Sequence, residues 1–131
     1  MTQIQKKPIE QSQPYNDSEL NDLIVESIRE IKGKEIVKID LRSLHDASAD
    51  YFIICSGEST TQIKAISDNI VKNVKDSLEE RPSHVEGKTE SRWILLDYFN
   101  TVVHVFHPET RLFYELEELW SDGKITEYDD L

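Results

Sequence analysis

The stretch that decides the fold is YFIICSGESTTQ, residues 51–62. Its first five residues are apolar on both faces of an extended chain, which is typical of a central, buried strand. Ser56-Gly57 ends that strand, and Ser59 and Gln62 then have the spacing of a helix-capping box. Apolar residues recur at helical spacing from Ile63 to Leu78. A buried strand that leads into a long helix predicts a domain in which helices cover a sheet.

On the N-terminal side of this stretch, the pattern predicts one helix and one strand. The helix is expected to begin near Asp17 or Ser18, either of which can cap it, and to stop at Gly33. A strand is expected over residues 35–41, where apolar and charged residues alternate. Residues 1–16 are rich in Gln, Lys, Pro and Ser, and we expect them to form a disordered extension.

On the C-terminal side, the pattern predicts a hairpin. Residues 84–87 are either a short strand or an extended lead. Residues 92–96 and 101–106 both have strand composition, and the short segment between them predicts antiparallel pairing. The complete set of elements predicts a mixed sheet with flanking helices, which is an α/β fold.

The last part of the chain is expected to be helical and then loose. Pro108 suits the first turn of a helix, whose inner stripe would be Leu112, Leu116 and Leu119. Residues 123–131 are expected to form a short, acidic, loose tail. The single folded domain is therefore expected over residues 17–122.

The charge balance bears on the kind of partner. The chain has 131 residues, of which 26 are acidic and 15 are basic, so its formal net charge is −11. A field of that sign repels phosphate backbones and disfavours direct nucleic-acid binding. Either a basic protein is the natural partner, or the charge serves only to keep the chain in solution.

The composition also suggests a location. Cys55 is the only cysteine, so no internal disulfide can form. No apolar stretch approaches the roughly 20 residues needed to span a bilayer, and the N-terminus resembles neither a signal peptide nor a transit peptide. We therefore expect a cytoplasmic protein with no membrane partner.

The sequence offers no support for catalysis. The Ser56-Gly57 turn lacks the second glycine and the Lys-Ser/Thr pair of a phosphate-binding loop. Ser56, His104 and Asp97 could be named as a hydrolase set, but nothing in their spacing selects them. His104 is expected to be a packed strand residue, and His107 part of the turn into the last helix. We expect no enzymatic activity, no cofactor and no metal site.

The hairpin around Trp93 and Tyr98 is the candidate partner-binding surface. Tyr98 and Phe99 lie at the expected turn, and turns usually lie on the surface. Exposed aromatics with acids nearby fit a partner site that has an apolar centre and a charged rim. The acids near this hairpin are Glu86, Glu90 and Asp97. On pattern alone, Trp93 is equally well a core residue, with Tyr98 and Phe99 folded back over a sheet edge.

Several motifs occur in one order over residues 18–122 and resemble the ribosomal silencing factor (Iojap) family. They are ADYFIICSG at 49–57, PSHVEG at 82–87, RWILLDY at 92–98, VVHVF at 102–106 and FYELEELW at 113–120. The resemblance implies a fold related to nucleotidyltransferases that lacks the catalytic carboxylates. It also implies that Trp93 and Tyr98 contact the partner.

The resemblance further implies a function. Members of the family bind the large ribosomal subunit through its fourteenth protein, a basic ribosomal protein, at the face that meets the small subunit. They thereby block subunit joining and repress translation when nutrients are limiting. Homodimers are known in the family, which makes a homodimer a further candidate assembly. The alternative is a degenerate nucleotidyltransferase-like protein or enzyme that binds a nucleotide at Ser56-Gly57.

The chain departs from the family at one turn. The family commonly has Gly-Asp where this chain has Phe99-Asn100. Glycine tolerates a positive φ, whereas phenylalanine does not do so without cost. The shape of the turn beside Tyr98 is therefore expected to differ.

Overall fold

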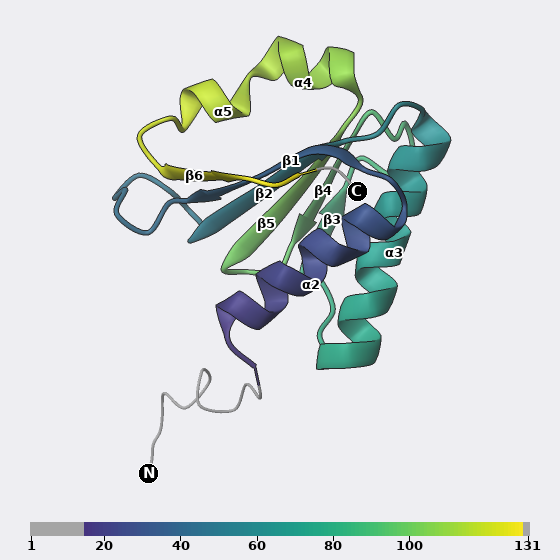
Figure 1. The fold of residues 1–131 in the computed structure, drawn as a ribbon, viewed down its shortest axis with the longest axis horizontal. Helices are drawn as coiled ribbons and strands as arrows, with labels where there is room; N and C mark the ends of the chain where they lie inside the picture. Colours follow the sequence, from purple (N-terminus) through teal and green to yellow (C-terminus); the bar gives the residue numbers. More distant parts are fainter. Residues whose placement is uncertain (1–14, 130–131) are drawn as a thin grey trace.

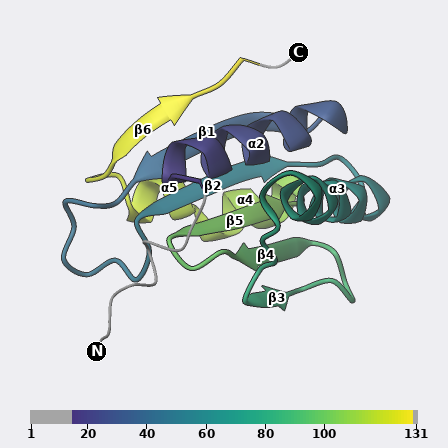
Figure 2. The same ribbon diagram turned by 90° about the horizontal axis from the view of Figure 1, so that it is seen from below.

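The structure, a computed structural model, describes residues 15–129. Its helices and strands follow in chain order: α2 (Asp17–Glu30), β1 (Lys34–Asp40), β2 (Tyr51–Ser56), α3 (Thr60–Leu78), β3 (His84–Glu86), β4 (Trp93–Asp97), β5 (Thr101–Phe106), α4 (Pro108–Tyr114), α5 (Leu116–Leu119) and β6 (Lys124–Glu127). The six strands form one sheet in the order β3-β4-β5-β2-β1-β6. Helices α2 and α3 cover one face of it, and α4 and α5 lie over the other (Figures 1 and 2).

The sheet is mixed, as expected. Strand β2 pairs in parallel with β5, while its pairing with β1 and the pairing of β4 with β5 are antiparallel. β2 therefore lies inside the sheet, which explains why its residues are apolar on both faces. Helix α3 carries the chain from β2 to β3 at the sheet edge. The predicted α/β class and the predicted hairpin are confirmed.

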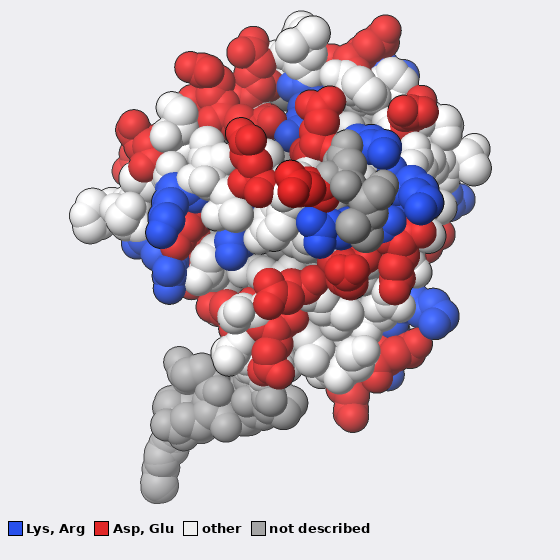
Figure 3. Space-filling model, in the orientation of Figure 1, with Lys and Arg blue, Asp and Glu red and all other residues white. Residues whose placement is uncertain are grey.

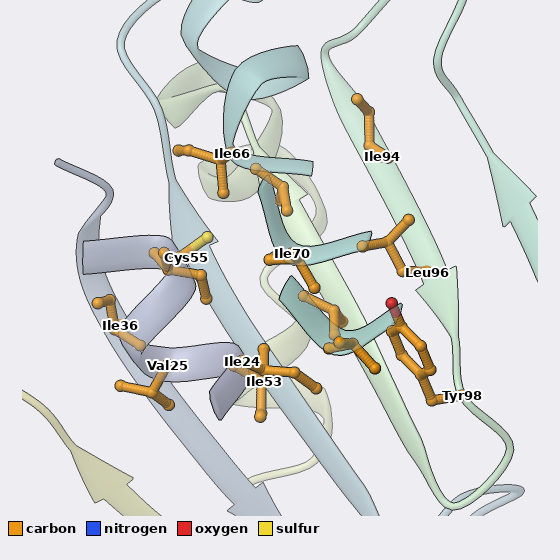
Figure 4. Packing of buried hydrophobic residues seen from close by; sticks show 14 of the residues in the cluster. Ile24, Val25, Ile36, Ile53, Cys55, Ile66, Ile70, Ile94, Leu96 and Tyr98 are labelled. Atoms are coloured by element: carbon orange, nitrogen blue, oxygen red, sulfur yellow. The ribbon is translucent and has the colours of Figure 1, made fainter. Parts of the chain in front are cut away.

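The main core lies between the sheet and the pair α2–α3. Ile24, Ile53, Ile66 and Ile70 are fully buried there, and Figure 4 shows them packed in one layer. A second, smaller cluster under α5 contains Ile39, Leu41, Ile54 and Phe106. Strands β1, β2, β4 and β5 thus contribute residues to two layers, one on each face of the sheet.

The two long helices are linked through their ends. Ser59 caps α3 by accepting a hydrogen bond from the Gln62 amide at 3.0 Å, as predicted. The Gln62 side chain does not complete the box: its amide nitrogen donates to the carbonyl of Ile31 at 3.0 Å. One residue therefore satisfies a carbonyl at the C-terminus of α2 and fixes the start of α3 against it.

The expected N-terminal boundary needs correction. The cap of α2 is Asn16, not Asp17 or Ser18, and it forms a complete capping box with Glu19. Tyr15 packs against the main core. The expected disordered extension therefore does not reach residue 16, and residues 1–14 lie outside the described residues.

The expected C-terminal tail and last helix also differ from the structure. Lys124–Glu127 forms β6, which pairs antiparallel with β1 at the edge of the sheet, so the loose-tail prediction is wrong there. The single last helix is two short helices, because Glu115 between them has a φ of 48°. Leu112 and Leu119 are 75% and 69% exposed, so they do not form an inner stripe.

Candidate functional site

Strand β4 divides the expected site residues between the two faces of the sheet. Ile94 and Leu96 are fully buried in the main core under α3. Trp93 instead packs against the second cluster, and Leu95 and Asp97 share its face by alternation. Because alternate residues of a strand face opposite sides of the sheet, only part of the hairpin lies where a partner can reach it.

Trp93 is half-buried in a group of aromatic rings. Its ring stacks on Phe106 and lies against Tyr114, with both centroid distances at 4.8 Å. Its indole N–H donates to Nδ1 of His104 at 3.1 Å. Because this donor is already used, Trp93 offers a partner an apolar ring edge rather than a hydrogen bond.

His104 is the buried support of Trp93. It is 3% exposed, and burial lowers its pKa to about 4, so the ring is neutral near neutral pH. Nδ1 accepts from Trp93, which leaves the ring proton on Nε2. The edge of the ring faces Phe52 at 4.6 Å between centroids. The prediction of a packed, hydrogen-bonded strand histidine is confirmed, and a solvent-accessible base is excluded.

Tyr98 is not exposed, contrary to the expectation. It is 5% exposed and points into the same layer as Ile94 and Leu96 (Figure 4). Its hydroxyl is buried without a hydrogen-bond partner among residues 15–129, and burial raises its pKa. The parity of β4 explains this placement, because residue 98 continues the alternation of residues 94 and 96. Tyr98 supports the turn from the core side.

Phe99 has a left-handed backbone conformation. Its φ is 78°, and 79% of its side chain is exposed. Oδ1 of Asp97 accepts a hydrogen bond from the Phe99 amide at 2.7 Å, which holds the turn. The chain therefore makes a left-handed turn with a phenylalanine at a position where glycine would adopt this conformation without cost. Whether this turn differs from that of relatives stays a prediction.

We define the Trp93 face as Glu86, Trp93, Leu95, Asp97 and Val102. The strand register brings Glu86 beside Leu95 and Asp97 beside Val102. Trp93, Leu95 and Val102 are half-buried apolar residues, and Glu86 is exposed. Gly87, with a φ of 89°, allows the chain to pass the carbonyl of Trp93, which a Cβ there would strike.

A shallow hollow lies at each end of the Trp93 face. One, of about 390 Å³, is lined by residues that include Glu90, Trp93 and Tyr114. The other, of about 310 Å³, is lined by Asp50, Asp97, Phe99 and Val102, among others. The face therefore combines an apolar floor with Asp50 and Asp97 at one end and Glu90, beside Arg92, at the other.

The Ser56-Gly57 turn does not fit a nucleotide. The hydroxyl of Ser56 accepts a hydrogen bond from Arg111 at 2.8 Å, and Arg111 also binds Glu117 at 2.6 Å. The hollow beside them is lined by Glu35, Glu115, Glu117 and Glu118. Four carboxylates there oppose a phosphate chain.

The hydrolase set is not assembled either. Ser56 is bonded to Arg111 and His104 to Trp93, so neither group relays a proton to the other. Among residues 15–129, no three His, Cys, Asp or Glu side chains are grouped so as to hold a metal ion. The sequence analysis missed Arg111, whose only signal is a basic residue directly before the apolar run Leu112-Phe113-Tyr114. Within the same residues, no helix is both long and apolar enough to cross a bilayer.

The structure is a small α/β domain with an apolar surface around Trp93. Comparison with known proteins identifies its family. The family model described as "Ribosomal silencing factor during starvation" matches residues 14–131. A ribosomal silencing factor of Bacillus subtilis is 38% identical over 101 residues, which cover 75% of this chain and 81% of that protein. The chain belongs to the ribosomal silencing factor (RsfS) family.

Two further relatives extend the comparison. A mouse protein named "Mitochondrial assembly of ribosomal large subunit protein 1" is 34% identical over 102 residues, covering 76% of this chain and 44% of that protein. A crystal structure of a protein from Chromobacterium violaceum has a TM-score of 0.77 at 30% identity, covering 82% of this chain and 88% of the other. The curated bacterial relatives are named as silencing factors and not as enzymes.

Proposed function

We propose that this protein binds the large ribosomal subunit through the Trp93 face and blocks joining of the small subunit. The observation that carries the proposal is the Trp93 face itself, an apolar floor with acids at both ends on a chain of the silencing-factor family. A basic protein of the large subunit is the complementary partner, and the family resemblance names its fourteenth protein. The name of the mouse relative, which refers to the large ribosomal subunit, supports the same partner.

The mechanism requires only occupancy. A factor seated on the joining face of the large subunit excludes the small subunit by its volume, and no bond is made or broken. Translation then falls as the fraction of occupied large subunits rises. Repression under nutrient limitation follows if the factor is abundant relative to active subunits at that time.

The roles of the site residues follow from their burial. Trp93 and Leu95 supply apolar area, and Phe99 projects beside the acidic end formed by Asp97. Glu86 and Glu90 are exposed and provide charge complementary to a basic partner. Tyr98 contributes by holding the turn, since its side chain is in the core.

The test is co-sedimentation of the tagged protein with dissociated subunits. We expect it in the large-subunit fraction and absent from intact ribosomes. A double variant, Glu86→Lys with Glu90→Lys, should weaken binding by about tenfold or more, because it places positive charge against a basic partner. These two side chains are exposed, so the fold should persist.

The matched control places the same charge change on the opposite side of the sheet. Asp22 and Glu26 are exposed on α2, and the Asp22→Lys with Glu26→Lys variant should bind as the wild type does. Equal weakening by both double variants would show that only net charge matters and would remove the Trp93 face from the proposal. Failure of the wild type to sediment with large subunits would overturn the proposed function itself.

A further inference from the structure

The second feature of this surface is an apolar ridge on α4 and α5. We define the ridge as Leu112, Phe113, Tyr114 and Leu119, which are 75%, 79%, 50% and 69% exposed. Large apolar side chains exposed singly are normal, but three consecutive ones on the short helix α4, with a fourth on α5, mark a candidate interaction site. Figure 3 shows uncharged side chains projecting over α4 with acidic side chains around them. The chain thus presents more apolar surface than the Trp93 face alone.

The ridge is exposed because the helix breaks at Glu115. With a φ of 48° at that residue, α5 starts in a new direction, and only Leu116 and Trp120 pack down onto the second cluster. Leu112 and Leu119 would have lain on the same side of one continuous helix as Leu116. The break turns them, together with Phe113, toward solvent.

The ridge is held firmly in this exposed position. Arg111, which is 8% exposed, bonds from α4 both to Ser56 of β2 and to Glu117 of α5. Tyr114 packs against Trp93 at 4.8 Å on one side and against Phe113 at 5.0 Å on the other. Phe113 is therefore the outer end of a series of rings that starts at the buried Phe106.

The ridge is also continuous with the Trp93 face. Tyr114 belongs to the ridge and lines the same hollow as Trp93 and Glu90. A partner that covers this hollow contacts both surfaces. Interface residues that dominate binding are typically aromatic and central, and Tyr114 lies where the two surfaces meet.

The charges around the ridge select the kind of occupant. Glu109, Glu115, Glu118 and Asp122 are exposed around it. The two arginines nearby are each paired with an acid, Arg111 with Glu117 and Arg92 with Glu109. A symmetric contact with a second copy would place these acids against their own equivalents. Like charges brought together across an interface are unfavourable, so a basic surface is the better match.

We infer that the apolar ridge is a second half of the docking surface and that its occupant is a basic protein surface with an apolar pocket for Phe113. This inference rests on the proposed function, because the same large-subunit partner would span the Trp93 face and the ridge. The ridge adds apolar area that the sheet face lacks.

The experiment replaces apolar side chains that have no buried role. A Phe113→Ser with Leu119→Ser variant is compared with wild type by quantitative sedimentation with purified large subunits. We expect the dissociation constant to rise by about tenfold or more, which is typical of losing a central aromatic contact. Val85→Ser is the control, since Val85 is exposed but lies on β3, away from α4 and α5.

The outcomes separate the two proposals. Wild-type binding together with unchanged binding of the ridge variant overturns the ridge and leaves the Trp93 face standing. Absence of wild-type binding overturns both. Sedimentation equilibrium of the free protein provides a second measurement: a wild-type dimer that becomes monomeric in the ridge variant would assign the ridge to a second copy and overturn the basic partner.

Discussion

At Phe99 the backbone turns with a φ of 78° while carrying a large, exposed side chain. A left-handed conformation costs an ordinary L-residue about 1–2 kcal/mol, and part of this is offset because glycine loses more entropy on folding. We predict that Phe99→Gly raises the free energy of unfolding by up to about 1 kcal/mol. Urea unfolding measures this change in the free energy of unfolding. Phe99→Ala, which removes the ring but keeps the Cβ, should give no such gain, and equal stability of the two variants would contradict the strain at this turn.

His104 gives the protein a defined response to acid. Its pKa is lowered from 6.5 to about 4 in the folded state by burial. As the pH falls below 6.5, the unfolded chain takes up a proton at this residue and the folded chain does not. The folded state therefore loses stability between pH 6.5 and 4, by about 3 kcal/mol in total.

The measurement is the melting temperature across that pH range for two variants. His104→Gln should flatten the decline, because the residue no longer titrates. His45→Gln, at an exposed position, should keep the wild-type decline. An unchanged slope in His104→Gln would show that His104 is not the responsible group.

At the residue level, the sequence predicted the roles of the two histidines correctly but not the burial of Tyr98. His104 and His107 were placed correctly, the latter as the cap of α4 that accepts a hydrogen bond from the Glu109 amide at 3.2 Å. The expectation of an exposed Tyr98 is wrong because residue 98 continues the alternation of Ile94 and Leu96 and therefore faces the core, although it borders the turn.

The last two helices and β6 show secondary structure that the sequence pattern alone does not predict. The period of apolar residues from 112 to 119 fits one helix, and no glycine or asparagine marks the break at Glu115. Strand β6 was missed for a different reason: Lys124–Glu127 is short and contributes no buried residue, and only its pairing with β1 makes it a strand. Both features depend on tertiary contacts that no local pattern contains.

The anchoring of α4 and α5 depends on Arg111. We predict that Arg111→Met lowers the free energy of unfolding by about 2–3 kcal/mol, because it removes hydrogen bonds to Ser56 and Glu117 and leaves Glu117 without its counter-ion. Chemical denaturation measures this loss in the free energy of unfolding. Lys72→Met removes the exposed pair with Asp76 and should change stability by less than about 1 kcal/mol. A comparable small effect at Arg111 would mean that the packing of Leu116 and Trp120 holds these helices alone.

For the whole molecule, the fold class was predictable because two signals are strong. The apolar run of β2 and the long apolar period of α3 leave little choice of architecture. The order of strands was not predictable, because β3 and β6 reach opposite edges through connections that carry no periodic signal. Predicting the proposed partner surface required both the local pattern and the tertiary arrangement, since its residues come from strands and helices that are distant in sequence.

The net charge of −11 belongs to the whole molecule and should affect association with a basic partner. We predict that the association rate with large subunits falls steeply as salt rises from about 0.01 M to 0.15 M, since the screening length shrinks from about 30 Å to 8 Å. Stopped-flow measurement with labelled protein gives this rate. The dissociation rate should change much less, because the apolar floor and ridge are insensitive to screening. A rate independent of salt would exclude electrostatic steering.

The position of β6 has a consequence for folding during synthesis of the chain. Synthesis proceeds from the N-terminus, so β1 is made before its neighbour β6, which follows the other five strands. Until residues 124–127 appear, the outer edge of β1 carries unpaired backbone groups, which are a template for pairing with another chain. Tyr128 then closes this edge by donating its amide hydrogen to the carbonyl of Ile36 at 3.0 Å. A nascent chain that stalls before residue 124 would therefore have a five-stranded sheet whose β1 edge can pair with another chain.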